Sequence, residues 1–294
     1  MAIFKGAGVA LVTPMLPNEE VNYSKLEELI EFQINNKTDA LIICGTTGEA
    51  STLSHDEHIE VVRYAVEKTA KRVPVIAGTG SNSTKTAIEL SQRAEAAGAD
   101  GLLIVSPYYN KTTQKGLIEH YTSVANAVQL PIIVYNIPGR TGLNIFPETM
   151  AYLANHVENI VGVKDAADNI SQTAKLMSLV GDDFSLYSGN DDQVLAMMVL
   201  GGSGVISTLS NIAPETMHNI TAEFFAGNIK EATRIQLNAL NIINAIFCEV
   251  NPIPVKTALN IIGMDVGPAR PPLYEMEPEN KKRLEDELRK FGLI

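Results

Sequence analysis

Hydrophobic positions along the chain gather in short apolar, β-branched runs, and each run is followed by a stretch with helical periodicity. A continuous apolar run is typical of a strand buried on both faces of a parallel sheet, and a 3.6-residue period is typical of a helix covering it. Eight such runs occur, at residues 7–13, 40–45, 75–78, 101–106, 132–136, 160–164, 184–188 and 204–208. Helical patterns lie between them, for example at residues 58–71 and 85–97.

Eight strand and helix repeats predict an α/β protein built as a closed (β/α)8 TIM barrel. A doubly wound sheet is the alternative, but its glycine-rich loop should follow the first strand, and here Gly6-Ala7-Gly8 comes too early. Only helical patterns follow the last run, at residues 214–226, 229–250, 254–263 and 278–291. We therefore expect a catalytic barrel domain over residues 1–224 and a C-terminal helical domain over residues 225–294.

Composition and charge exclude several classes of partner and site. The formal net charge is −11 and no Lys/Arg-rich block occurs, which argues against a nucleic-acid or anionic-membrane partner. Cys44 and Cys248 stand alone in apolar stretches, without the spacing of a zinc site or a disulfide framework. The first residues lack a cleavage pattern, and Pro14 and Pro17 interrupt them, so we expect a cytoplasmic protein.

The residues that end the predicted strands carry many hydroxyl and phenol groups. In a (β/α)8 barrel the active site lies at these ends. They are Gly45-Thr46-Thr47-Gly48-Glu49, Ser106-Pro107-Tyr108-Tyr109-Asn110, Tyr135, Arg140, Lys164, Ser188-Gly189-Asn190 and Ile206-Ser207. No pair of Asp or Glu stands among the strand ends as two-carboxylate hydrolysis needs, and the five histidines show no metal-ligand spacing.

Lys164 ends the sixth apolar run and is the strongest candidate for chemistry. At the mouth of a buried strand a lysine loses solvation as a cation, so its pKa falls and its amine can attack a carbonyl to form a Schiff base. The alternative is a strand-terminal lysine at the surface. Because an acidic neighbour would raise the lysine pKa, the nucleophile interpretation requires Asp165 to point to the opposite face of the strand.

Three further positions could serve such a lysine. Tyr135, one strand earlier, could pass protons to and from a carbinolamine, or could simply be a packed tyrosine. The loop with Thr46 and Thr47 offers hydroxyls and backbone N–H groups to a carboxylate, although as a bare pattern it is weak. Arg140 could bind a second carboxylate through both ends of its guanidinium, or could lie at the surface.

Together these segments resemble the dihydrodipicolinate synthase family of the pyruvate-dependent class I aldolases, from the first strand to the C-terminal helices. The motifs that carry the resemblance are Gly45-Thr46-Thr47-Gly48-Glu49, Ser106-Pro107-Tyr108-Tyr109-Asn110-Lys111, the run from Tyr135 to Gly142, Gly162-Val163-Lys164, and the run from Gly201 to Ser207.

The resemblance implies a lyase that condenses pyruvate with L-aspartate 4-semialdehyde to 4-hydroxy-tetrahydrodipicolinate, the first committed step of the diaminopimelate and lysine pathway. It implies no metal and no organic cofactor, because the covalent intermediate is a Schiff base between Lys164 and pyruvate. It also implies a homotetramer, built as a dimer of dimers.

Carried over by position, Lys164 is the nucleophile and Tyr135 the proton donor and acceptor. Thr46 would link Tyr135 to Tyr109 of the adjacent subunit in a proton relay. The resemblance assigns substrate binding to five residues: Thr46 and Thr47 would hold the pyruvate carboxylate, Gly189 and Ile206 would line the site, and Arg140 would hold the semialdehyde carboxylate.

Two departures from the family pattern matter. The turn after Lys164 reads Asp165-Ala166-Ala167-Asp168-Asn169, where a Glu and a Gly are commoner. The resemblance also implies an effector site for lysine at Ala50, Ser51, His55, His58, Asn82, Thr86 and Tyr108. Lysine-sensitive members generally have a glutamate at the Thr86 position, so we expect weak or absent inhibition by lysine.

Two other functions stay open at this point. A related lyase could act on sialic acid or a keto-deoxy sugar acid, although such lyases carry no arginine at the position of Arg140. A noncatalytic barrel could sense keto acids, but it would have no need for both Lys164 and Tyr135.

Overall fold

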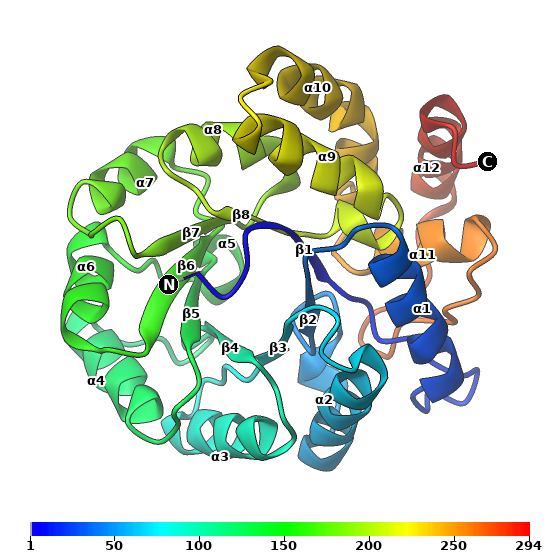
Figure 1. Cartoon of the computed structure of the whole chain (residues 1–294). Helices are drawn as coiled ribbons and strands as arrows, with labels where there is room; N and C mark the ends of the chain where they lie inside the picture. Colours follow the sequence, from blue (N-terminus) through cyan, green and yellow to red (C-terminus); the bar gives the residue numbers. More distant parts are fainter. Residues whose placement is uncertain (1) are drawn as a thin grey trace.

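Eight parallel strands form a closed barrel in the computed structural model, which describes residues 2–294 (Figure 1). Each strand pairs with the next along the chain, and the last pairs with the first. The strands are β1 (Gly6–Ala10), β2 (Ala40–Ile43), β3 (Val75–Gly78), β4 (Gly101–Val105), β5 (Ile132–Asn136), β6 (Ile160–Asp165), β7 (Ser185–Ser188) and β8 (Gly204–Ser207). The predicted (β/α)8 barrel is confirmed.

Helices cover the outside of the barrel. They are α1 (Tyr23–Asn35), α2 (His55–Thr69), α3 (Thr84–Ala96), α4 (Gln114–Ala125), α5 (Pro138–Thr141), α6 (Pro147–His156), α7 (Ile170–Met177), α8 (Val194–Val199), α9 (Pro214–Phe225), α10 (Ile229–Ile246), α11 (Ile253–Ile261) and α12 (Pro278–Phe291), with 3-10 turns η1 (Ala50–Thr52), η2 (Asp191–Gln193) and η3 (Leu209–Asn211). Local chemistry sets several starts. Ser54 and Glu57 form a capping box at α2, for example, and a proline opens α6, α9 and α12.

Element boundaries differ from the expected ones by a few residues, for reasons visible in the backbone. The first strand ends at Ala10 rather than at residue 13, because the Val12 N–H donates to Asn211 Oδ1 instead of to a neighbouring strand. The second strand ends before Cys44, whose φ of 55° turns the chain into the following loop. Helix α2 begins three residues before the expected start, where the Ser54 cap places it.

The barrel interior is a separate core from the layer between strands and helices. Its buried side chains are Phe4, Ala10, Ala40, Ile42, Ile76, Leu103, Ile133, Tyr135, Ala166, Tyr187 and Ile206. Phe4 and Tyr187 stack with ring centroids 4.4 Å apart, and the Tyr187 hydroxyl donates to the Phe4 carbonyl at 2.7 Å. These rings fill the end of the barrel where the strands begin, so the opposite end is left for the site.

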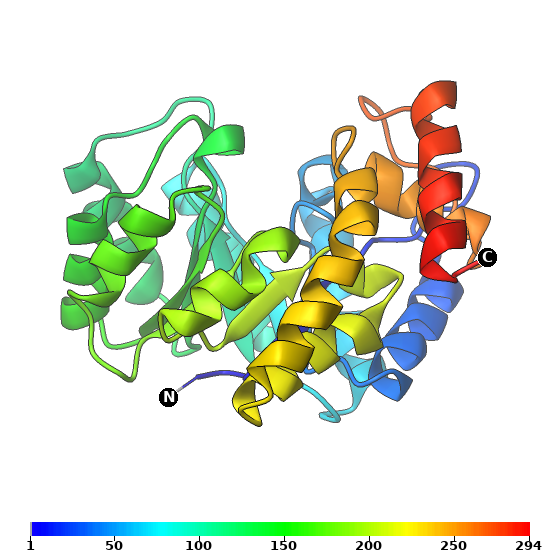
Figure 2. The ribbon, with the colours of Figure 1, turned by 90° about the horizontal axis from the view of Figure 1, so that it is seen from above.

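The C-terminal helices flank one side of the barrel (Figure 2). Helix α10 packs against α9 and α12, and α11 packs against α12. The segment between α10 and α11 reaches the C-terminal ends of the strands, where Phe247 and Asn251 line a cavity. The division into domains at residues 224 and 225 stays a prediction. None of the helices among residues 2–294 combines the length and apolar character that crossing a membrane requires.

Candidate active site

A cavity of about 350 Å³ opens at the C-terminal ends of the strands. Six of the predicted site residues line it, namely Thr46, Thr47, Tyr135, Arg140, Lys164 and Gly189. They come from the ends of β2, β5, β6 and β7 and from the loops that follow, so residues far apart in the sequence meet at one edge of the barrel.

Lys164 and Tyr135 stand side by side at the mouth of the barrel. The two residues are paired in the register of β5 and β6, and the Lys164 Nζ lies 4.4 Å from the centroid of the Tyr135 ring. Both side chains are 6% exposed. Asp165 faces the opposite side of β6, where it accepts a hydrogen bond of 2.7 Å from the Thr173 hydroxyl. The expected separation of Asp165 from the Lys164 amine is confirmed.

The pKa of the Lys164 amine falls from 10.5 to about 8, chiefly because of burial, and the Arg140 guanidinium acts in the same direction. The buried Asp191 carboxylate acts in the opposite direction. A pKa near 8 leaves about one amine in ten neutral at pH 7, whereas an ordinary lysine is neutral in fewer than about one molecule in a thousand. The neutral form is the one that can act as a nucleophile, so this environment suits the predicted role of Lys164.

Tyr135 is a protonated phenol in this cavity. Burial raises the pKa of its hydroxyl to about 12, against the opposing effects of the Arg140 charge and of a hydrogen bond with the Thr46 side chain. A phenol in this state can donate a proton to a group on the adjacent amine. The Thr46 side chain lies close enough to Tyr135 to lower the pKa of its phenol, and the proton relay through Thr46 stays a prediction.

The loop with Thr46 and Thr47 is tied to the C-terminal helices. Glu49, which ends the loop at a φ of 56°, accepts a hydrogen bond of 2.6 Å from Lys256 of α11. The two side chains are 0% and 3% exposed. The second oxygen of Glu49 accepts from the Arg270 N–H at 2.8 Å. This buried ion pair fixes the loop against a distant part of the chain.

Sequence reasoning did not single out Asp191, whose charge acts on Lys164, or Asn251, which lines the cavity. Asp191 is 2% exposed, and its Oδ2 accepts from the backbone N–H groups of Thr208 and Leu209 at 3.0 and 2.8 Å. It follows the strand end Ser188-Gly189-Asn190, so an acidic residue so close to a strand end was an available signal. Asn251 lies among the C-terminal helices, where no pattern pointed to a barrel site.

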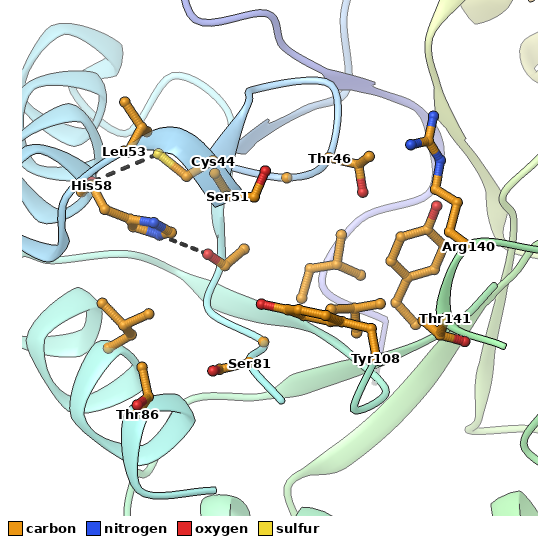
Figure 3. A pocket seen from close by; sticks show the side chains of 18 of the residues that line it. Cys44, Thr46, Ser51, Leu53, His58, Ser81, Thr86, Tyr108, Arg140 and Thr141 are labelled. Atoms are coloured by element: carbon orange, nitrogen blue, oxygen red, sulfur yellow. Dashed lines mark hydrogen bonds between the residues drawn. The ribbon is translucent and has the colours of Figure 1, made fainter. Parts of the chain in front are cut away.

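A second cavity of about 330 Å³ adjoins the first and shares Thr46, Tyr135 and Arg140 with it (Figure 3). Its wall includes six of the seven predicted effector residues, Ala50, Ser51, His55, His58, Thr86 and Tyr108. Asn82 is not among the lining residues.

The His58 imidazole is neutral in this second cavity. Burial lowers its pKa to about 4, and its Nε2 lies 2.8 Å from the Gly78 carbonyl oxygen, to which it donates. The lining residues of the cavity include no Asp and no Glu. A cationic guest would therefore find no carboxylate in this wall.

Three other predicted residues have different surroundings. Tyr109 is 91% exposed and has a φ of 69°, so its ring stands away from the rest of the chain. Ile206 is buried inside the barrel and does not line the cavity. Gly189 lines the cavity, and it also packs tightly against the end of β6, where an added Cβ would lie 2.6 Å from the Ala166 Cβ and 2.9 Å from the Asp165 carbonyl oxygen. Within residues 2–294, no group of three or more His, Cys, Asp or Glu side chains could hold a metal ion.

A buried lysine of lowered pKa beside a tyrosine, at the mouth of an eight-stranded parallel barrel, is the arrangement of a barrel enzyme that acts through a Schiff base. The chain belongs to the dihydrodipicolinate synthetase family, whose model matches residues 3–291. The family expected from the motifs is therefore confirmed.

Relatives match along the whole chain. The 4-hydroxy-tetrahydrodipicolinate synthase of Lachnoclostridium phytofermentans is 60% identical over 294 residues, which cover 100% of both chains. The crystal structure of the chloride-inhibited dihydrodipicolinate synthase from Acinetobacter baumannii complexed with pyruvate is 42% identical, with a TM-score of 0.96 and 99% coverage of each chain. The lysine-bound enzyme from Cyanidioschyzon merolae is 40% identical, with a TM-score of 0.97 and 100% coverage of each.

Proposed function

We propose that this chain condenses pyruvate with L-aspartate 4-semialdehyde to 4-hydroxy-tetrahydrodipicolinate, the first committed step of the diaminopimelate and lysine pathway. The names of the full-length relatives bear out this lyase activity as predicted from the sequence. The observation that carries the assignment of roles is the buried Lys164 amine beside the Tyr135 phenol at the mouth of the barrel.

In the proposed reaction the neutral Nζ of Lys164 attacks the keto carbon of pyruvate and forms a carbinolamine. Tyr135 gives its proton to the carbinolamine hydroxyl, which leaves as water, and an iminium remains. The phenolate then takes a proton from the methyl carbon, which restores the phenol and produces an enamine. No metal or organic cofactor takes part in these steps.

The enamine carbon then attacks the aldehyde carbon of the second substrate, whose oxygen takes up the proton of the Tyr135 phenol. The amine of that substrate displaces Lys164 from the iminium carbon, which closes the ring and regenerates the free lysine, and the proton that the ring nitrogen loses returns to the Tyr135 phenolate. Arg140 lies on the wall of the cavity and would hold the carboxylate of this substrate through its guanidinium fork.

Borohydride reduction tests the Schiff base directly. The intact mass should increase only when pyruvate is present, and peptide mapping should place the adduct on Lys164. Lys256 is an internal comparison, because it is equally buried but paired with Glu49, and a Lys164→Met variant is the negative control. An adduct on Lys256, or no adduct at all, would overturn the assignment.

We also propose a cytoplasmic homotetramer in which Tyr109 completes the relay of an adjacent subunit. The 91% exposure of its ring supports this arrangement, because it leaves the phenol free to reach the cavity of a neighbouring subunit. Tyr109→Phe keeps the ring and removes the hydroxyl, so it should lower kcat by about a hundredfold without changing the sedimentation of the assembly. A fully active Tyr109→Phe variant excludes the relay, and a fully active monomer excludes the shared site.

We propose that the second cavity is the effector site and that it binds lysine weakly. Its wall contains no carboxylate for the ammonium groups of lysine, and the His58 side chain there is neutral at pH 7. A charge-assisted hydrogen bond is worth about 1.5–3 kcal/mol, so its absence lowers affinity by at least about tenfold.

A further inference from the structure

One residue of the segment between α10 and α11 contacts two of the residues to which we assign carboxylate binding. Asn251 lies between α10 and α11, is 8% exposed and lines the active cavity. Its side-chain Nδ2 donates to the Thr47 hydroxyl at 2.9 Å. Its backbone carbonyl accepts from Arg140 Nη2, also at 2.9 Å. A single residue thus touches Thr47 through its side chain and Arg140 through its backbone.

We propose that Asn251 is a positioning residue that orients the Thr47 hydroxyl toward the carboxylate of pyruvate and holds one end of the Arg140 guanidinium. The proposal rests on the proposed function, because it takes the occupant of the cavity to be a pair of carboxylate substrates. It assigns to a C-terminal residue a part in substrate selection that none of the strand-end motifs supplies.

The chemistry of a hydroxyl group explains how Asn251 orients Thr47. A threonine hydroxyl has one hydrogen to donate, and it presents that hydrogen to an anion most readily when another donor occupies its lone pair. Asn251 supplies that donor, and the Thr47 hydroxyl donates to no acceptor among residues 2–294. Its hydrogen is therefore available to the pyruvate carboxylate.

Guanidinium geometry explains the second contact. Binding of Nη2 to the Asn251 carbonyl leaves Nη1 and Nε of Arg140 free to grip a carboxylate, and it reduces the rotamer freedom that substrate binding would otherwise remove. Because this contact is made by the backbone, substitution of the Asn251 side chain should leave it in place. The two carboxylate sites should therefore respond differently to a side-chain change.

The test uses the full-length protein and compares half-saturation by the two substrates. Asn251→Asp has nearly the same shape, but it cannot donate to Thr47 and it adds a negative charge. We expect the pyruvate concentration for half-maximal borohydride trapping to rise about 10- to 100-fold, and the KM for the semialdehyde to change less than about threefold. Asn251→Ala should give a smaller rise in the half-saturating pyruvate concentration, because it removes the donor to the Thr47 hydroxyl but adds no negative charge.

Asn260→Asp is the matched control. Asn260 also belongs to the C-terminal helices, but its amide bonds to the backbone of Gly267 on the exposed side of α11, away from the cavity. It should change neither half-saturation value. Trapping at saturating pyruvate should still modify Lys164 in every variant, which establishes that each one folds and keeps its nucleophile.

The outcomes separate this inference from the proposed function. If the wild-type protein forms no pyruvate adduct, the function and the inference both fail. If it forms the adduct but Asn251→Asp leaves pyruvate binding unchanged, the amide does not orient Thr47 and only the inference fails. Equal weakening for both substrates would mean a general disturbance of the site and would also reject the inference.

Discussion

Replacing Lys164 by methionine should stabilise the folded protein at neutral pH. The pKa of the buried amine is about 8 instead of 10.5, and each tenfold change in an ionisation equilibrium corresponds to about 1.4 kcal/mol. Keeping the protonated amine in this environment therefore costs the native state about 3 kcal/mol. Methionine has a similar length and no charge, so Lys164→Met removes the cost together with the activity.

The expected gain depends on pH in a defined direction. Below pH 8 the amine is protonated in both the native and the unfolded chain, so the full cost is present. Between about pH 8 and pH 10.5 the native amine loses its proton while the unfolded amine keeps its own, and wild-type stability rises relative to the variant. The variant should be more stable by about 3 kcal/mol at pH 7, and the pH-dependent part of this difference should vanish near pH 10.5.

Urea unfolding of both proteins, at one protein concentration and at several pH values from 7 to about 10, measures the difference. Lys230→Met is the control, because Lys230 is exposed on α10 and its replacement should change the free energy of unfolding by less than about 0.5 kcal/mol at every pH. A Lys164→Met variant that is no more stable at pH 7, or whose gain is the same at every pH, would refute the reasoning.

Three other outcomes are expected. Asp191→Asn removes a charge that raises the pKa of Lys164, so the pH midpoint of borohydride trapping at low pyruvate should move below about 8. An unchanged midpoint would show that the Asp191 charge does not act on the Lys164 amine. Lys256→Met leaves Glu49 buried without its partner and should cost about 3–5 kcal/mol in urea unfolding, while the double variant with Glu49→Gln should lose much less; equal losses would contradict this. Lysine should inhibit the steady-state reaction only weakly, and Thr86→Glu should strengthen the inhibition; micromolar inhibition of the wild type would show that another group binds the effector.

The local hydrophobic pattern was sufficient to predict the barrel, because the strand and helix signal repeats eight times. Apolar runs of four to seven residues, each followed by a helical period, leave few other ways to bury both faces of a sheet. Boundaries were less certain where a tertiary contact replaced a ladder bond, as the Val12 to Asn211 bond does at the end of β1.

Some residues of the candidate site could be predicted from the sequence, and others depended on tertiary contacts. Lys164, Tyr135 and Thr46 stand at strand ends, and the geometry of a barrel brings strand ends together, so their proximity followed from position in the chain. Asp191 could have been noticed beside β7, but its charge effect on the Lys164 amine depends on how η2 is held against the end of β8.

The sequence by itself determined which side chains can do chemistry and at which strand ends they stand, because strand and helix periods are local properties of the chain. Only the tertiary structure decided that Asn251 reaches Thr47 from 204 residues away, and that Lys256 meets Glu49 across 207 residues. The same holds for the lowered pKa of Lys164. Its value reflects the water excluded by all the walls of the cavity and the charges that Arg140 and Asp191 bring to it, and no single segment contains that information.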